Sequence, residues 1–323
     1  MKIGFHASHE QFAPSRLLKL VQQAEDAGFD AAMCSDHIHP WSNVQGESGF
    51  AWSWLGAALH ATKFSFGVVN APGQRYHPAI IAQAVATLNE MFPERQWIAV
   101  GSGQALNEHI TGEKWPKKRD RNARLKECVE VMRALWRGET VLHDGLVTVE
   151  NAKLYSLPEK PPMITGAAVT AKTATWMAPW VDGLITVSRS NEKLKGVVKA
   201  FRENGGADKP LFLQSKHAWA PDHDEALRDA HEQWRTNLFA SKVLSDFEMP
   251  EQFEKASKYV RPEDVQEKVR VSAEPGQHAE WLDEFFELGF DEVYLHNVGT
   301  NQEAFIDAFG KDVLPQFQTS EAA

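Results

Sequence analysis

Between Cys34 and Trp41 the chain places an acid, two imidazoles and an indole within one short stretch. This stretch follows the apolar run Phe29–Met33, which is bounded by chain-breaking residues and therefore predicts a buried strand. In a β/α barrel the catalytic groups lie at the C-terminal ends of the strands. We therefore expect Asp36 and His37 to perform acid–base or binding chemistry. A helix N-cap by Asp36, with surface histidines beyond it, is the alternative.

Polar side chains also follow four other predicted strands. Because the parallel strands of a barrel end at one rim, we expect these side chains to share that rim with Asp36 and His37. They are Asn70, Gln104, Asn107, His217, His296 and Asn297.

Two chemistries suit such a rim. His37 and His39 form an H-x-H pair, a pattern of metal ligands that His217 and His296 would extend, but no carboxylate closes the set and we expect no metal. The other chemistry is a flavin site. The small residues 166–170 lie between a predicted strand and a helix start, where backbone N–H groups can approach a phosphate. An ordinary small-residue turn is the simpler explanation of that segment alone.

The elements that must position these residues alternate between strands and helices. Apolar runs predict eight strands, at 2–6, 29–33, 64–70, 97–100, 162–165, 184–187, 211–216 and 293–296. Helical spacing predicts the intervening helices, at 14–27, 50–62, 79–91, 118–136, 169–179, 191–204, 280–288 and 302–314. Eight such units without a break in composition predict a single α/β domain, a (β/α)8 TIM barrel.

Two segments exceed what a barrel needs. Turn residues among alternating residues predict a small β excursion over about 139–156. The charged, helical stretch of about 222–272 is longer than one crossover requires and predicts a helical lid. We assign residues 1–318 to the barrel with these insertions and 319–323 to a loose tail.

The composition limits the partners. The 323 residues carry a formal charge of −10, from 44 acidic and 34 basic side chains, which argues against nucleic-acid and membrane partners but leaves room for a local basic pocket. The two cysteines lie in separate predicted elements, so we expect no disulfide and a cytoplasmic protein. We also expect no signal peptide and no membrane-spanning run.

Taken together, the motifs resemble those of the bacterial-luciferase-like flavin oxidoreductases. The similarity is strongest to the branch that contains the deazaflavin-dependent glucose-6-phosphate dehydrogenases, and it covers most of the chain. The segments that carry it are Ala7–Pro14, Ser35–Trp41, Arg75–Ala79 with Ile81–Ala84, Gly101–Glu108, Leu135–Gly138 and Leu288–Asp291.

This resemblance implies roles for the site residues. His37 would be the acid–base group beside the hydride-bearing carbon, Asp36 would contact the cofactor ring, and Trp41 would flank the substrate. The other implied cofactor contacts are Asn107 with the backbone of Ser102 and Gly103, then Ala167, Ala168, Thr170 and Ala171 at the phosphate, and Val69 and Asn70 at a non-proline cis peptide.

The chain departs from that branch at two places. Gln104 replaces a glutamate near ring nitrogen N1. A carboxylate about 4 Å from an anionic reduced flavin would repel it by about 4 kcal/mol, so the neutral amide favours FMN over the deazaflavin. The threonine and lysine that hold the sugar phosphate fall on Val187 and Ser190, which argues against glucose 6-phosphate, although Arg189 beside them can still meet an anion.

The sequence therefore predicts an FMN-dependent oxidoreductase, either a luciferase-like monooxygenase or a hydride-transfer enzyme, with His37, Trp41 and Gln104 as catalytic residues. A deazaflavin-dependent sugar or sugar-phosphate dehydrogenase is the alternative. A non-catalytic flavin-binding protein and a metal-dependent hydrolase are alternatives of other classes. The expected partners are a small-molecule substrate, a flavin reductase that supplies reduced FMN, and a second copy of the chain in a homodimer.

Overall fold

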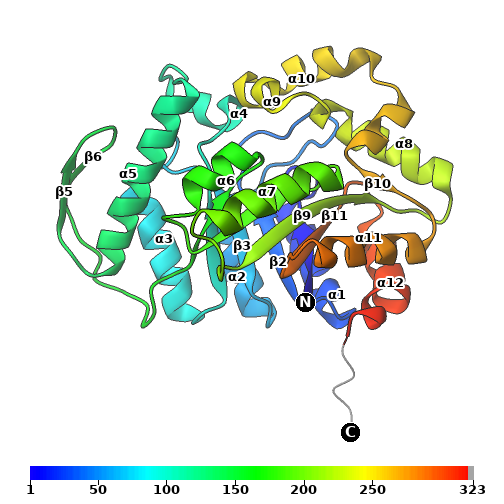
Figure 1. Cartoon of the computed structure of the whole chain (residues 1–323), viewed down its shortest axis with the longest axis horizontal. Helices are drawn as coiled ribbons and strands as arrows, with labels where there is room; N and C mark the ends of the chain where they lie inside the picture. Colours follow the sequence, from blue (N-terminus) through cyan, green and yellow to red (C-terminus); the bar gives the residue numbers. More distant parts are fainter. Residues whose placement is uncertain (319–323) are drawn as a thin grey trace, which may run out of the picture.

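Parallel strands close into an eight-stranded barrel in the computed structural model, which describes residues 1–318 (Figure 1). Around the barrel the order is β9, β11, β1, β2, β3, β4, β7 and β8, and β8 pairs with β9 to complete the circle. This confirms the predicted TIM barrel. The strands are β1 (Lys2–Ala7), β2 (Ala31–Ser35), β3 (Phe66–Asn70), β4 (Gln96–Val100), β7 (Ile164–Ala167), β8 (Gly183–Val187), β9 (Leu211–Ala218) and β11 (Glu292–Asn297).

Helices cover the outside of the barrel, and several begin with the proline that is favoured in a first helical turn. Within residues 1–318 no helix combines the length and apolar content that crossing a bilayer requires. The outer helices are α1 (Pro14–Asp26), α2 (Ala51–Ala61), α3 (Pro78–Met91), α5 (Lys118–Trp136), α6 (Ala171–Met177), α7 (Asn191–Glu203), α11 (Pro275–Glu287) and α12 (Gln302–Asp312).

Two insertions extend beyond the barrel. An antiparallel hairpin, β5 (Val141–Asp144) and β6 (Thr148–Ala152), lies beside α5 at the left edge of Figure 1. Short helices cross the upper part of the same view, above the C-terminal ends of the strands, and we call them the lid: α8 (His223–Trp234), α9 (Ser241–Asp246) and α10 (Pro250–Ala256). The segment 319–323, which we predicted to be a loose tail, lies outside the described residues.

Several predicted boundaries were wrong. The second strand begins at Ala31 and not at Phe29, and α11 begins at Pro275, five residues before the predicted start. Within the stretch of about 222–272, which was predicted to be a helical lid, the structure has the three helices α8, α9 and α10. The short strand β10 (Arg270–Val271), which pairs with β9 outside the closed circle, was missed because two residues cannot show a strand period.

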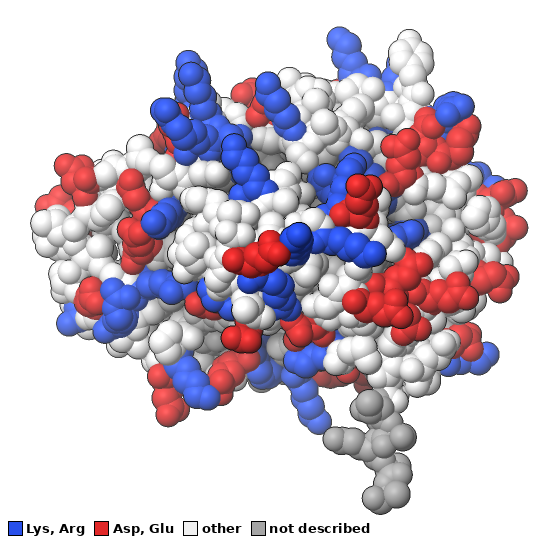
Figure 2. Space-filling view, viewed as in Figure 1, with Lys and Arg blue, Asp and Glu red and all other residues white. Residues whose placement is uncertain are grey.

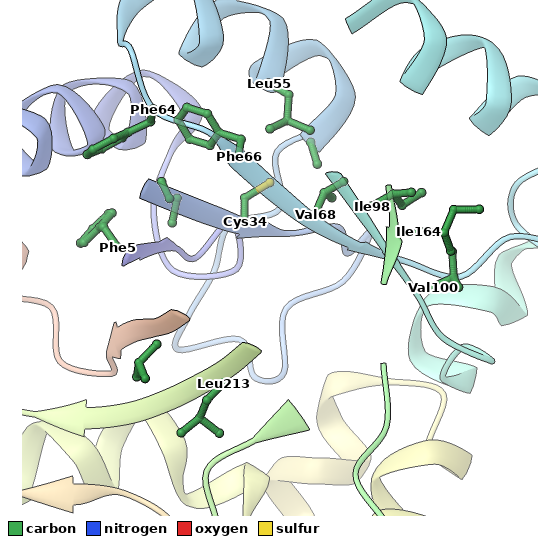
Figure 3. Packing of buried hydrophobic residues seen from close by; sticks show 14 of the residues in the cluster. Phe5, Cys34, Leu55, Phe64, Phe66, Val68, Ile98, Val100, Ile164 and Leu213 are labelled. Carbon is green, nitrogen blue, oxygen red and sulfur yellow. The ribbon is translucent and has the colours of Figure 1, made fainter. Parts of the chain in front are cut away.

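The main core lies between the barrel and the surrounding helices, where strand residues that point outward pack against helix residues. Figure 3 shows Leu55 of α2 facing Cys34, Phe66 and Val68 of the neighbouring strands. All are fully buried or nearly so, and such interfaces give the hydrophobic stabilisation of the barrel.

The inside of the barrel is filled by three aromatic rings, those of Trp97, Phe212 and Tyr294. Their centroids lie 5.0–6.2 Å apart. The rings fit because two facing strand positions lack a side chain: a Cβ at Gly67 would overlap the Trp97 ring, and one at Gly4 would overlap the Tyr294 ring. This aromatic layer closes the barrel below the site.

We predict that Gly67→Ala destabilises the protein by about 1–3 kcal/mol or more, because the added methyl group must displace the Trp97 ring from a close-packed layer. Gly56→Ala is the matched control, since its Cβ would meet Leu88 only at 3.9 Å and alanine favours the α2 helix. Urea unfolding midpoints measure both. Equal midpoints for the two variants would contradict the packing argument.

Candidate active site

A cavity of about 1310 Å³ opens at the C-terminal ends of the strands, between the barrel and the lid. Almost every residue predicted for the site lines it. Three predicted residues are absent from the lining: Ala171, which begins α6, and the expected rim residues His217 and Asn297. The predicted residues in the lining are Asp36, His37, Trp41, Val69, Asn70, Ser102, Gly103, Gln104, Asn107, Ala167, Ala168 and Thr170.

The His37 imidazole has its orientation and tautomer set by two acceptors. Its Nδ1 lies 3.4 Å from Glu10 Oε1 and 3.3 Å from the carbonyl oxygen of His39. Since a carboxylate and a carbonyl can only accept, Nδ1 carries the hydrogen and Nε2 keeps its lone pair. The Trp41 ring packs beside the imidazole, with centroids 5.2 Å apart. His37 is thus prepared to accept a proton at Nε2.

Glu10 is a site residue whose role the sequence left undecided between pocket and surface. It is buried, and Ser8 and Ser35 donate hydrogen bonds to its Oε2. Burial by itself would raise the pKa of Glu10, but the neighbouring His37 and the hydrogen bond from Ser35 outweigh that effect and lower the pKa. The carboxylate therefore stays charged next to His37.

Asp36 is held by three donors. Asn70 Nδ2 donates to its Oδ2 at 2.7 Å, Tyr76 Oη donates to its Oδ1 at 3.0 Å, and the Arg75 guanidinium lies 3.4 Å from Oδ1. Arg75 also reaches the next loop, because its backbone N–H donates to Glu108 Oε2 at 2.8 Å. One buried arginine therefore connects the loops that follow β2, β3 and β4.

The loop after β4 brings backbone and amide groups to the cavity. Gly103 has a φ of +77°, a conformation that favours glycine, and its carbonyl accepts a hydrogen bond from Arg121. Asn107 Oδ1 accepts from the Ile38 backbone N–H at 3.0 Å, so it fixes the His37 loop. Gln104 precedes the short helix α4 (Ala105–Glu108) and lines the cavity beside them.

The opposite wall comes from the turn after β7. Ala167 and Ala168 leave the cavity wide there, and the Thr170 side chain caps α6 by accepting from the Thr173 backbone N–H at 3.2 Å. The cis peptide expected near Val69 and Asn70 is wrong, since all peptide bonds of the described residues are trans. The trans form is the strongly favoured one for a non-proline residue, and the ordinary pairing of β3 with β4 accommodates it.

The predicted rim was wrong at two residues. His217 and Asn297 are buried but absent from the cavity lining. His217 Nδ1 lies 2.8 Å from His278 Nδ1 on the outer side of the barrel. Successive strand residues point to opposite faces, so Lys216 faces the cavity and His217 cannot.

The H-x-H pair also separates. His39 Nδ1 lies 3.0 Å from the carbonyl oxygen of Leu106, and the ring stacks on His109 outside the cavity lining. Among residues 1–318 no group of three or more His, Cys, Asp or Glu side chains could hold a metal ion. The pair therefore offers no assembled ligand set for the metal-hydrolase alternative.

The floor of the cavity carries three buried polar groups: His296, which was predicted for the rim, and His6 and Lys216, which the sequence interpretation missed. Burial lowers the pKa of His6 to about 3, and the His296 ring lies 4.5 Å from it with a pKa also well below its usual value for the same reason. Lys216 is 8% exposed, and burial, together with the nearby Arg189 and Lys268, lowers its pKa to about 7. The signal in the sequence was the spacing of Gln214 and Lys216, which lie two positions apart in one strand and therefore share a face.

Positive charge dominates the cavity wall. Ten lysine and arginine residues line it against four acidic residues, in a chain whose net charge is −10. Two of the four acids share the single guanidinium of Arg75, and a third faces His37. Such a cavity concentrates anions.

The lid is tied to the barrel by hydrogen bonds across the cavity. Arg189, after β8, donates to Ser241 at 3.0 Å, and Arg121 of α5 donates to Ser245 at 3.1 Å. Phe253 of α10 packs edge-on against Trp41, with ring centroids 5.4 Å apart. This closed arrangement limits the access of water to the site.

Comparison with protein families gives a match to the luciferase-like monooxygenase model over residues 1–292. An F420-dependent glucose-6-phosphate dehydrogenase from Beutenbergia cavernae is 34% identical over 333 aligned positions, which cover 99% of this chain and 98% of that protein.

Solved structures are also similar. An F420-dependent secondary alcohol dehydrogenase in complex with an F420–acetone adduct has a TM-score of 0.90 and 29% identity, with 98% of this chain and 99% of that one covered. The oxygenating constituent of a type II Baeyer–Villiger monooxygenase from Pseudomonas putida, in complex with FMN, has a TM-score of 0.72 and 17% identity, with 99% of both chains covered, and shows the fold alone.

We predict that Arg75→Met lowers the free energy of unfolding by about 3–5 kcal/mol, because it leaves Asp36 and Glu108 buried without their cation. Burial already raises the pKa of Glu108, so protonation relieves the unpaired charge and the loss should be smaller at pH 5 than at pH 7. Tyr76→Phe is the control, since it removes one donor to Asp36 but no charge. Urea titrations at both pH values measure the losses, and a loss that grows at pH 5 would contradict the prediction.

Proposed function

The chain belongs to the luciferase-like monooxygenase family of flavin-dependent oxidoreductases, and within it we propose an F420-dependent dehydrogenase that oxidises an alcohol carrying an oxyanion. This gives preference to the deazaflavin over the FMN that the sequence favoured. The relatives support the choice, since they include an F420-dependent dehydrogenase 34% identical over nearly the whole chain and an F420-bound neighbour 29% identical.

The residues of the cavity fit such a cofactor. A flat ring system needs an apolar slot, which Val69 of β3, Ala167 of β7 and Ile185 of β8 provide. Asn70 Oδ1 is buried and has no hydrogen-bond partner among residues 1–318, so it can accept from a ring N–H. The cofactor supplies a hydride acceptor when bound, and the protein supplies orientation and proton transfer.

The observation that carries the substrate class is Lys216. Its amine is buried and forms no ion pair with a carboxylate in residues 1–318, and Nζ donates only a long 3.4 Å bond to Gln214 Oε1. Two further cations near it, Arg189 and Lys268, lower its pKa further and leave the group without compensation. A buried cation of this kind is costly unless an anion pairs with it. The phosphate or carboxylate of a substrate would be that anion.

His37 is the base of the proposed reaction. The substrate hydroxyl would give its proton to Nε2 while the C–H hydrogen leaves as hydride, so that an alcohol becomes a carbonyl compound. The resulting imidazolium is stabilised by the Glu10 carboxylate 3.4 Å from Nδ1. Trp41 and the lid keep water away from the reacting carbon.

FMN is the second candidate cofactor, and Gln104 is the observation that favours it. A neutral amide in the cavity wall does not repel the anionic N1 of a reduced flavin. Binding titrations with F420 and with FMN on the same apoprotein separate the two. Tight FMN binding without F420 binding would reject the deazaflavin.

We expect His37→Ala to lower kcat for F420 reduction by about 10²–10⁴-fold while the affinity for F420 stays nearly unchanged, because the imidazole moves a proton and does not hold the ring. Glu10→Gln should give a smaller loss, since it keeps the Nδ1 acceptor but removes the charge. Stopped-flow absorbance gives kcat and fluorescence quenching gives the affinity. Loss of F420 binding in His37→Ala would make His37 structural.

A panel of alcohols tests the substrate class. Each phosphorylated or carboxylated alcohol, beginning with glucose 6-phosphate, is compared with its neutral counterpart. Lys216→Met should reduce kcat/KM for the anionic member by about tenfold to a hundredfold and leave the neutral member unchanged. Lys126→Met, at an exposed ion pair of α5, is the control. Equal turnover of anionic and neutral members by the unmodified protein would reject the oxyanion.

A further inference from the structure

Two histidines from different loops lie against each other outside the catalytic cavity. His39 lies in the loop after β2, and His109 begins the 3-10 turn η1 (His109–Thr111) that follows α4. Their ring centroids are 5.2 Å apart, and the ring planes are inclined by 27°. Neither residue lines the cavity. The partner of His39 in the folded chain is therefore His109, and not the His37 that the H-x-H pattern suggested.

The hydrogen bonds of the two rings set the same tautomer in both. His39 Nδ1 lies 3.0 Å from the carbonyl oxygen of Leu106 in α4. His109 Nδ1 lies 2.9 Å from the carbonyl oxygen of Ala105, which precedes Leu106. A carbonyl oxygen can only accept, so both Nδ1 atoms carry the hydrogen and both Nε2 atoms keep a lone pair. Histidines that bind metals are oriented by a hydrogen bond of this kind from the other ring nitrogen.

The placement of the two rings suits a shared ion. Because both Nδ1 atoms face the α4 backbone, the Nε2 atoms lie on the sides of the rings away from it. Both residues are half-buried, and neither Nε2 is among the buried polar atoms that lack a partner. Two imidazoles on one tetrahedral ion, with metal–nitrogen distances of about 2.0–2.1 Å, have ring centroids about 5 Å apart. The observed separation of 5.2 Å agrees with that geometry.

The surroundings determine which ions can bind. Within residues 1–318 no third His, Cys, Asp or Glu joins the pair, so water would complete the coordination of a tetrahedral ion. Figure 2 shows Lys and Arg side chains projecting from the upper left of the molecule, the part near α4 where α5 begins in Figure 1. Mg²⁺ and Ca²⁺ need oxygen ligands, whereas imidazole suits Zn²⁺, Cu²⁺ and Ni²⁺. The histidine pair should therefore select the second group.

We propose that His39 and His109 bind one divalent transition-metal ion, of the class of Zn²⁺, Cu²⁺ and Ni²⁺, through their Nε2 atoms. The ion would connect the loop after β2 to the turn after α4. Both segments adjoin groups of the catalytic cavity, because the carbonyl oxygen of His39 lies 3.3 Å from Nδ1 of His37, and Asn107 belongs to α4. Occupation of the site would thus restrain the loop that presents His37.

Metal titrations of the full chain test the site without cofactor or substrate. The protein carries no affinity tag, because a histidine tag would bind the same ions. We expect calorimetry to give one ion per chain, with Cu²⁺ bound most tightly, Mn²⁺ most weakly, and no competition from Mg²⁺. The electron paramagnetic resonance spectrum of bound Cu²⁺ should show two nitrogen ligands. Zn²⁺ should also raise the urea midpoint, since a ligand that binds only the folded state stabilises it.

Single substitutions identify the ligands. His39→Gln and His109→Gln each remove one imidazole, while the glutamine amide can still donate a hydrogen bond to the α4 carbonyl. Each should weaken Zn²⁺ binding by more than about tenfold, because even the loss of a second-shell partner costs a metal site about 10–100-fold in affinity. His60→Gln, at an exposed histidine in the last turn of α2, is the matched control and should leave binding unchanged. Urea midpoints without metal show whether the variants fold.

Three results would overturn the site. These are an unmodified protein that binds none of the three ions, Zn²⁺ binding that is equally tight in both variants, and a Cu²⁺ spectrum with fewer than two nitrogen ligands. The second result would mean adventitious binding to other histidines. If a variant fails to fold, the nitrogen count in the unmodified protein decides. The dehydrogenase proposal is tested separately, because the metal titrations contain neither cofactor nor alcohol.

Discussion

The site depends on one buried guanidinium, that of Arg75. It is paired with Asp36 at 3.4 Å and lies 3.9 Å from Glu108, and all three side chains are almost completely excluded from solvent. Because these residues belong to three successive strand–loop units, the ion pairs fix the loops that present His37 and Asn107 to the cavity. Removing one partner of a buried ion pair leaves the other charge uncompensated, which is strongly destabilising. The three loops of the rim should therefore keep or lose their arrangement together.

Different parts of the cavity differ in the pairing of their charged side chains. Asp36 and Glu108 share the Arg75 guanidinium and Glu10 faces His37, whereas Lys216 at the floor of the cavity forms no ion pair with a carboxylate in residues 1–318. An acidic protein thus places uncompensated positive charge in the wall of the cavity that a ligand would enter. The proposed function accordingly places the base His37 in a cavity that also carries uncompensated cations, beneath the lid.

The alternation of strands and helices was predictable because a barrel strand buried on both faces appears as a short apolar run, and because its helices begin at proline. The long helix 118–136 was predicted with its observed bounds. Two kinds of element were predicted wrongly. The strand β10 has two residues and is too short to show the alternation by which a strand is recognised. Elsewhere the error concerned which face of a strand a side chain lies on. His217 was assigned to the rim and lies behind it, while Lys216, one residue earlier, was overlooked in the cavity.

The sequence by itself determined the barrel, the family and the local motifs, because hydrophobic periodicity and the motif from Ser35 to Trp41 are properties of neighbouring residues. Only the tertiary structure decided which groups act together. Glu10 and His37 lie 27 residues apart, and Lys216 meets Arg189 and Lys268 only because the strands close into a circle beneath the lid. The tautomer of His37 and the missing ion-pair partner of Lys216 depend on burial and on distances between residues far apart in the chain. A local pattern of residue types does not contain that information.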